Sequence, residues 1–197
     1  MKYIDLINKI KEPIFSLQDL RLLGLKVFPY QISDWAKKGY IIPLKNGLYA
    51  FADKKNVLAG EHIAFSLYQP SYISMERALS FYGLIPEMVY SHTCVTAKTT
   101  RTFENIFGVF SYRHIKREMF FGYLELTKNN QPYLIAEPEK ALIDFLYLNR
   151  NKIKTKADID EMRFNSDELK KIDRQKIKRY NTAICNSRVD EILKMLF

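Results

Sequence analysis

Apolar residues recur with a helical period at the amino terminus of the chain. A first amphipathic stripe, at steps of three and four residues, consists of Tyr3, Leu6, Ile7 and Ile10. Pro13 follows it and is expected to end the helix. Ser16 then stands as an N-cap for a second short helix, with Asp19 where a capping box usually has Glu or Gln. Gly24 is placed to end that helix with a left-handed turn.

A third helix is predicted to begin at Pro29, whose fixed φ angle suits the first helical position, and to end at Gly39. Ile32, Trp35 and Ala36 form its apolar face. The other face carries polar and aromatic side chains, namely Tyr30, Gln31, Ser33, Asp34, Lys37 and Lys38. Amides and hydroxyls suit base edges and lysines suit phosphates, so this face is a candidate DNA-reading surface. An ordinary solvated face is the alternative, which the acidic Asp34 favours.

Asn46-Gly47 follows and is the strongest two-residue indication of a β-hairpin, here with a type I′ turn. The predicted register pairs Lys45 with Leu48, Leu44 with Tyr49 and Ile42 with Phe51. Lys45 and Asn46 at the tip would lie over the backbone or minor groove of DNA. Three helices followed by a hairpin predict a winged helix-turn-helix DNA-binding domain over residues 1–55.

The polar segment 53–56 marks the predicted boundary to a second domain, residues 56–197. Helical patterns cover 57–67 and 74–82, and a period of two then predicts strands at 89–96, 100–103, 109–115, 120–126 and 132–135. A helical stripe returns at 137–148, and the chain from 155 onward is helical and basic. The whole is therefore expected to be an α+β protein, with a small, mainly antiparallel sheet and a helical basic tail behind the winged helix.

The distribution of charge along the chain indicates a class of partner. The net charge of +9 is unevenly placed: +5 over residues 1–55, zero over 56–150 and +4 over 151–197. Basic ends suit a polyanion such as double-stranded DNA, although ordinary solubility charge is the alternative. No run of about 18 apolar residues exists, which argues against a membrane partner. The amino terminus lacks a signal-peptide core, so a cytoplasmic location is expected.

Candidate chemistry is sparse. Asp158-Ile159-Asp160 has the spacing of a nucleotidyltransferase metal pair, and Glu168-Leu169-Lys170 has that of a restriction-type nuclease, but both lie in polar, helix-prone segments. The three histidines lack metal-ligand spacing, and the glycines stand singly, without a phosphate loop. We therefore expect no catalytic residues, no metal and no cofactor, and a protein that is not an enzyme.

A basic group in the middle of the chain is the most distinctive polar feature there. It consists of Lys98, Arg101, Arg113 and Lys116. If strand alternation places Arg101, Arg113 and Lys116 on one face, that face is a candidate surface for an anion or a partner. A solvated loop with threonine-rich strand edges is the alternative.

Four sequence blocks carry a family resemblance: PSYISMERALSFYGLIPE (70–87), TTRTFEN (99–105), GVFSYRHIK (108–116) and AEPEKALIDFLYL (136–148). In this order they resemble the AbiEi family of antitoxins, which are transcriptional regulators of type IV toxin–antitoxin (abortive infection) systems in phage defence. The resemblance runs from the winged helix to about Arg150. It implies a winged helix that binds operator repeats and represses its own operon, and a C-terminal domain that counters a nucleotidyltransferase-like toxin. Gln31, Ser33, Lys37, Lys38 and Lys45 fall where the family's DNA contacts would lie.

Three functions thus stand as hypotheses. The first is the antitoxin and repressor, which is expected to self-associate on an inverted repeat because one winged helix makes few base contacts. The second is a nuclease or nucleotidyltransferase with a DNA-targeting winged helix. The third is a protein-interaction module whose winged helix binds protein.

Overall fold

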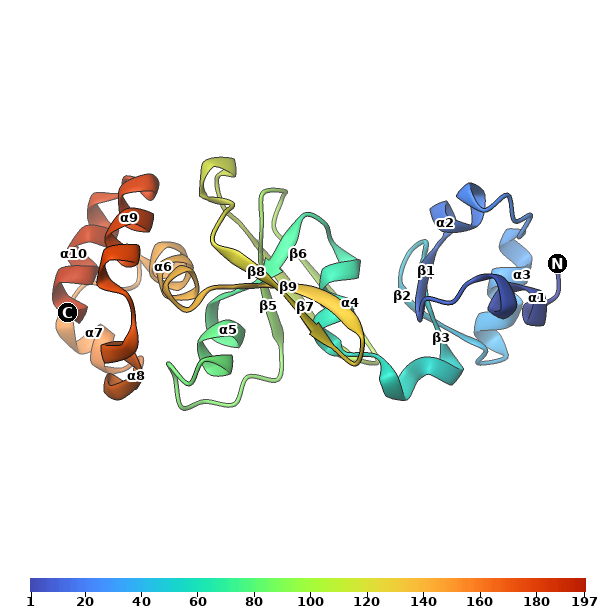
Figure 1. The fold of residues 1–197 in the computed structure, drawn as a ribbon, viewed down its shortest axis with the longest axis horizontal. Helices are drawn as coiled ribbons and strands as arrows, with labels where there is room; N and C mark the ends of the chain where they lie inside the picture. Colours follow the sequence, from blue (N-terminus) through green and yellow to red (C-terminus); the bar gives the residue numbers. More distant parts are fainter.

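The computed structural model describes all residues, 1–197, and is a mixed α+β fold with two sheets. Figure 1 shows three parts in a row: a small sheet with three helices at one end, a larger sheet in the middle, and a group of helices at the other end. We call the first part, residues 1–51, the N-terminal unit. Its elements are α1 (Tyr3–Lys9), β1 (Ile14–Ser16), α2 (Leu17–Leu22), α3 (Pro29–Lys37), β2 (Ile41–Lys45) and β3 (Leu48–Phe51).

The three predicted helices of this unit form where the sequence places them. Ser16 accepts a hydrogen bond from the Asp19 backbone N–H at 3.1 Å, and the Asp19 carboxylate accepts one from the Ser16 N–H at 2.7 Å. This is the predicted capping box, with Asp in place of Glu. Pro29 is the first residue of α3, as expected. The sheet has the order β1-β3-β2 and is antiparallel; β1 was not predicted.

The hairpin register differs from the prediction. Lys45 pairs with Leu48 as expected, but Pro43 pairs with Tyr49 and Ile42 with Ala50, so the other two predicted pairs are wrong. The register shifts between Pro43 and Lys45 because a bulge inserts one extra residue there. Gly47 has a φ of +79°, whereas Asn46 is not among the residues with positive φ, so the turn is not type I′.

The central sheet has six strands in the order β6-β7-β5-β4-β9-β8. The strands are β4 (Ser71–Ile73), β5 (His92–Thr96), β6 (Arg101–Asn105), β7 (Gly108–His114), β8 (Tyr123–Lys128) and β9 (Gln131–Ala136). Two of its five ladders, β4 with β9 and β5 with β7, are parallel. The sheet is therefore mixed, and it is larger than predicted because β4, which was not foreseen, joins its two halves.

Helices cover both faces of this sheet (Figure 1). On one face lies α4 (Gly60–Leu67), where the Tyr112 hydroxyl of β7 donates to the Ala64 carbonyl at 2.6 Å. On the other lie α5 (Met75–Phe81) and α6 (Pro138–Asn149), and the Tyr72 hydroxyl of β4 donates to Asp144 of α6 at 2.9 Å. The 3₁₀ segments η1 (Ala52–Val57) and η2 (Arg117–Met119) connect elements; η1 occupies the predicted polar boundary.

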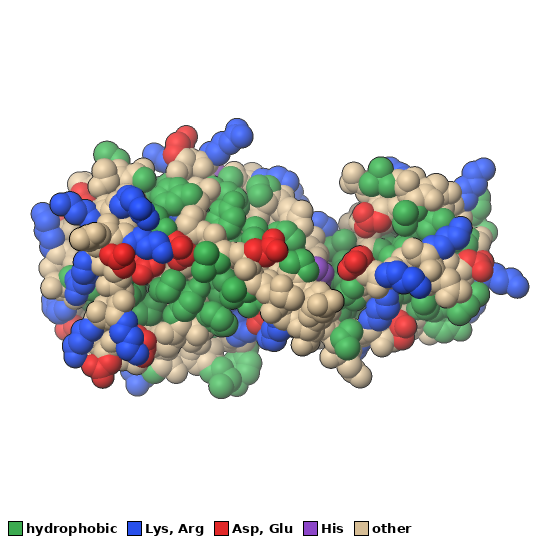
Figure 2. Space-filling view, in the orientation of Figure 1, with side chains coloured by type: hydrophobic (Ala, Val, Ile, Leu, Met, Phe, Trp, Pro, Cys, Tyr) green, Lys and Arg blue, Asp and Glu red, His purple; other side chains and the backbone are tan.

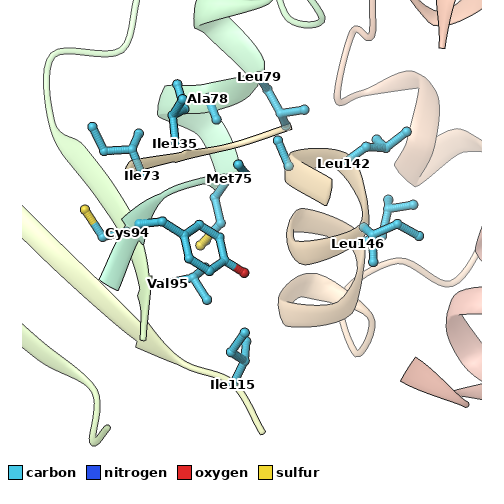
Figure 3. Close-up of a cluster of buried hydrophobic side chains, with 14 of the residues drawn as sticks. Ile73, Met75, Ala78, Leu79, Cys94, Val95, Ile115, Ile135, Leu142 and Leu146 are labelled. Carbon is cyan, nitrogen blue, oxygen red and sulfur yellow. The ribbon is translucent and has the colours of Figure 1, made fainter. Parts of the chain in front are cut away.

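Four further helices pack on the outer side of α6: α7 (Lys156–Asp160), α8 (Ser166–Lys171), α9 (Arg174–Ile184) and α10 (Ser187–Leu196). The predicted basic tail is thus helical, but it is a packed layer rather than an appendage. Ile177, Val189 and Ile192 are buried in the same hydrophobic cluster as the central sheet. Figure 3 shows part of that cluster: Val95 lies on the sheet side of α6, and Leu142 and Leu146 extend from the side of α6 away from the sheet.

The N-terminal unit is joined to the central sheet by side chains of its hairpin. Leu44, Leu48 and Ala50 are buried in the large hydrophobic cluster and not in the unit's own core. The Asn105 amide of β6 donates to the Leu44 carbonyl at 3.3 Å, which places β2 beside β6. The hairpin therefore serves as the joint between the two parts of the molecule.

Candidate nucleic-acid interface

Helix α3 separates its side chains into a buried and an exposed face. Ile32 and Trp35 are buried in the core of the N-terminal unit, with Leu6, Phe15 and Phe51. The helix lies on the side of the unit away from the central sheet (Figure 1). Its exposed side chains among the predicted contacts are Tyr30, Ser33, Lys37 and Lys38. These four hold the aromatic, hydroxyl and ammonium groups that a nucleic acid can meet.

Gln31 takes a different position from the one predicted. Its amide oxygen accepts the Phe28 backbone N–H at 3.0 Å, and its amide nitrogen donates to the Met1 carbonyl at 2.7 Å. The side chain is half-buried. Both ends of the amide are therefore used to start α3 and to hold the first residue of the chain, which restrains the side chain from turning toward a base edge.

The acidic residue of the exposed face has a local partner. Asp34 accepts a hydrogen bond from Lys38 at 2.8 Å, one turn further along α3. This bond raises the pKa of Lys38 above its usual range. The pairing offsets the charge of Asp34, so Lys37 is the exposed cation of α3 that forms no ion pair.

Exposed apolar side chains occur along the chain from the end of α2 to the start of α3. Leu22 and Leu23 end α2, and Phe28 and Tyr30 flank Pro29; Leu22 is 77% exposed and Tyr30 is 69% exposed. The Phe28 and Tyr30 rings stack, with centroids 5.7 Å apart and planes 10° apart. We call these four side chains the α2–α3 apolar patch. Stacked, exposed rings offer a surface to a base, a sugar or an apolar protein side chain.

The two hairpin residues predicted to contact DNA lie in different environments. Asn46 is exposed and lines a cleft of about 310 Å³ beside α2 and the start of α3. Lys45 is half-buried, and its ammonium donates to the Leu67 carbonyl at the end of α4. Carbonyls at a helix carboxyl end carry partial negative charge and lack intrahelical partners, so a lysine is well suited to that place.

Lys45 meets two residues of the predicted middle basic group. Its ammonium lies 5.7 Å from the centre of the Phe103 ring, while the Lys98 ammonium and the Arg101 guanidinium lie 5.6 and 5.9 Å from the Tyr68 ring. Burial lowers the pKa of Lys45, and the positive charges of Lys98 and Arg101 lower it further. Three cations from two parts of the chain thus gather at the joint.

The other two members of the predicted basic group lie elsewhere. Arg101 pairs with Tyr112 across β6 and β7, so their side chains share a face. Arg113 is the next residue after Tyr112 and therefore points to the opposite face of the sheet. Lys116 lies beyond the end of β7, at the start of η2. Arg101, Arg113 and Lys116 therefore do not share one face, because the register separates Arg101 from Arg113.

The acidic pairs that suggested a nuclease have structural partners. Asp158 caps α7, accepting the Thr155 N–H and the Lys154 N–H at 2.7 Å each, and these bonds lower its pKa. Asp160 lies 3.7 Å from Lys156. In α8, Glu168 pairs with Lys171 at 2.7 Å, and Lys170 pairs with Asp167 at 2.9 Å. No group of three or more His, Cys, Asp or Glu side chains is arranged to hold a metal ion.

One polar site was missed altogether. Lys140 and Asp144 of α6 are fully buried and form an ion pair, and Asp144 also accepts the Tyr72 and Ser74 hydroxyls at 2.9 and 2.8 Å. Burial raises the pKa of Asp144 and lowers that of Lys140. Opposite charges four residues apart in a mostly apolar helix were the only indication in the sequence. The site joins sequence blocks 70–87 and 136–148.

In Figure 2, lysine and arginine side chains are frequent at both ends of the visible face, and hydrophobic side chains occupy much of the surface between them. None of the helices combines the length and the apolar character that crossing a bilayer requires. No protein-family model and no curated protein matches the chain.

Proposed function

We propose that this protein is a DNA-binding transcriptional regulator whose N-terminal unit is a winged helix. The observation that carries the proposal is the exposed face of α3, which holds Tyr30, Ser33, Lys37 and Lys38 on a helix at the side of the N-terminal unit away from the central sheet. The order of elements, three helices followed by the β2–β3 hairpin, supports it. Hydroxyls and one free ammonium can contact bases and phosphates while Ile32 and Trp35 hold the helix in place.

The regulator is proposed to bind as two copies on an inverted repeat. Helix α3 has nine residues, which is about 13.5 Å of helix and spans only a few base pairs. A single copy therefore makes few base contacts, and two-fold symmetric sites are the usual remedy. The +5 charge of residues 1–55 adds attraction to the phosphate backbone without regard to sequence.

We further propose that the regulator is the antitoxin of a type IV toxin–antitoxin system. This part rests on the resemblance of four sequence blocks to the AbiEi family. Two of those blocks supply the buried Lys140–Asp144 site, so the residues that carry the resemblance are ones that hold the central sheet to α6. The partner is proposed to be a nucleotidyltransferase-like toxin, which the central sheet and its helices counter.

A binding assay tests the DNA proposal. Fluorescence anisotropy with a labelled duplex from the region upstream of the gene is expected to show tighter binding than with a scrambled duplex. Ser33→Ala should reduce that preference, and Lys37→Ala should weaken binding to both duplexes. Lys55→Ala, an exposed lysine in η1, is the matched control for loss of one charge. Equal affinity for the two duplexes, unchanged by Lys37→Ala, would reject the α3 surface.

A growth assay tests the antitoxin proposal separately. The full chain carrying Ser33→Ala and Lys37→Ala is expected to lose operator binding and still to rescue cells that express the neighbouring nucleotidyltransferase-like gene. Loss of rescue in a variant that folds normally would tie protection to DNA binding. Failure of the wild-type chain to rescue would reject the antitoxin role and leave the DNA proposal standing.

The α2–α3 apolar patch favours a second candidate, in which the N-terminal unit binds protein. Leu22, Leu23, Phe28 and Tyr30 are exposed apolar side chains between the end of α2 and the first turn of α3. The single variant Leu22→Ser and the double variant Leu22→Ser with Tyr30→Ser discriminate between DNA binding and protein binding by the N-terminal unit. Under the DNA proposal, Leu22→Ser alone leaves affinity for the duplex unchanged. Under the protein proposal, the wild-type chain binds no duplex and the double variant loses its protein partner.

A further inference from the structure

Lys45, Lys98 and Arg101 form a group of cations without salt bridges, and Glu12 and Asp19, which line the same cleft as Lys45, form no ion pair with it. The salt bridges of the molecule all involve other residues. The nearest acid in the sequence, Glu104 of β6, is an odd number of residues from Arg101 and therefore points to the opposite face of the sheet. We call this group the junction triad, because Lys45 belongs to the N-terminal unit and the other two to the central sheet.

Aromatic rings hold the triad in place. Lys98 and Arg101 both lie over Tyr68, and Lys45 lies over Phe103. The Tyr68 hydroxyl is 3.2 Å from the Thr99 hydroxyl, which fixes the turn that carries Lys98. A cation over a ring face is attracted by the π electrons, so the rings offset part of the repulsion that three neighbouring positive charges create. The fold thus tolerates a concentration of charge that it does not cancel.

The triad keeps free donors toward solvent. A lysine ammonium has three N–H donors, and Lys45 gives one of them to the Leu67 carbonyl. Lys98 and Arg101 are exposed. Together they present ammonium and guanidinium donors to an anion, which would relieve the mutual repulsion that lowers the pKa of Lys45.

We propose that the junction triad binds phosphate groups of the same DNA duplex that α3 reads. The inference rests on the proposed function and deepens it, because it adds a second contact outside the N-terminal unit. Exposed cations on an open surface suit a long polyanion, which needs no enclosing pocket. Asn46 stands next to Lys45 at the hairpin tip, so the hairpin links the cleft beside α2 and α3 to the triad at the joint.

A salt series on the full chain tests the proposal. For duplex DNA the slope of log K against log salt is about −0.9 for each phosphate neutralised. Lys98→Ala with Arg101→Ala should therefore make the slope less negative by about 1.8. The variant's loss of affinity relative to the wild-type chain should therefore be about tenfold greater at 50 mM salt than at 200 mM. Preference for the upstream duplex over the scrambled one should stay unchanged, because phosphates carry no sequence.

The matched control removes the same charge at Arg113, which points to the other face of the sheet, and at Lys116, which lies beyond the end of β7. Arg113→Ala with Lys116→Ala should leave the slope as in the wild-type chain. All four residues are exposed, and circular dichroism is expected to show that both variants fold. An unchanged slope in the Lys98 and Arg101 variant would overturn the triad while leaving α3 binding intact. Equal loss in the control pair would assign the effect to net charge and also overturn it.

A third arm separates DNA from a free phosphate compound. Inorganic pyrophosphate should compete with the duplex only as its ionic strength predicts. Saturable pyrophosphate binding that depends on Lys98 and Arg101, with an unchanged DNA slope, would assign the site to a small ligand and overturn the duplex contact. No DNA binding by the wild-type chain at low salt would reject the proposed function and this inference with it.

Discussion

We expect the buried ion pair between Lys140 and Asp144 of α6 to have a large effect on the stability of the fold. Lys140→Met keeps the apolar length of the side chain and removes the ammonium that faces Asp144. The carboxylate then retains only the Tyr72 and Ser74 hydroxyls as donors in a site that solvent does not reach. Removing one partner of such a pair typically costs about 3–5 kcal/mol in the free energy of unfolding. For a chain of this size, that lowers the melting temperature by about 6–20 °C.

Urea unfolding followed by circular dichroism measures this cost, with Lys170→Met as control. Lys170 forms an exposed pair with Asp167, so its loss should change stability by no more than about 0.5 kcal/mol. The double variant Lys140→Met with Asp144→Asn should be more stable than Lys140→Met alone, because no uncompensated charge remains buried. A loss below about 1 kcal/mol in Lys140→Met, or a double variant less stable than the single one, would refute the reasoning.

Three further outcomes are expected. Burial, aided by the positive charge of Arg77, lowers the pKa of His92 from 6.5 to about 4, so the unfolded chain binds a proton first as the pH falls. The free energy of unfolding should therefore drop by up to about 3 kcal/mol between pH 6.5 and 4. His92→Gln should remove this pH dependence. Gln31→Ala should cost about 1–2 kcal/mol through two lost hydrogen bonds, with no change in sequence preference on DNA. Lys45→Met should weaken the contact between the N-terminal unit and the central sheet, so the unit should unfold at a lower urea concentration than the rest of the chain. Trp35 fluorescence reports the N-terminal unit, and its transition should then precede that of circular dichroism. Coincident transitions in this variant would show that Lys45 does not hold the two parts together.

The parts of the fold that sequence predicts well are those determined by neighbouring residues. Ser16 and Asp19 cap α2, and Pro29 starts α3, because each effect acts within one helical turn. The period of two located five of the six central strands to within a few residues, because each strand has its own alternation. Local patterns therefore gave the order of the elements.

The missed features depend on contacts between distant residues. Strand β4 is only three residues long and is paired by β5 and β9, so it carries little periodicity of its own. The bulge near Leu44 arises where β2 also contacts β6. Lys45 was predicted at a free tip and instead bonds to Leu67, 22 residues further along the chain. No pattern in one segment specifies which other segment will lie beside it.

The residues of the candidate interface also fall into two groups: those whose exposure the sequence predicts, and those that only the fold brings together. Tyr30, Ser33, Lys37 and Lys38 are exposed because they alternate with Ile32 and Trp35 on one helix, which sequence reveals. The junction triad joins Lys45 to Lys98 and Arg101, which are 53 and 56 residues away in the chain, so only the folded molecule brings these charges together. Strand register, also hidden from sequence, placed Arg113 on the other face.

The salt dependence of binding to the upstream duplex tests α3 and the junction triad together. Lys37, Lys45, Lys98 and Arg101 supply four phosphate contacts, so the slope of log K against log salt should be about −3.6 for each bound copy of the full chain. Lys37→Ala should make the slope less negative by about 0.9, and Lys55→Ala should not change it. A duplex that stays unbound at low salt, or a slope near zero for the wild-type chain, would contradict DNA binding through this surface.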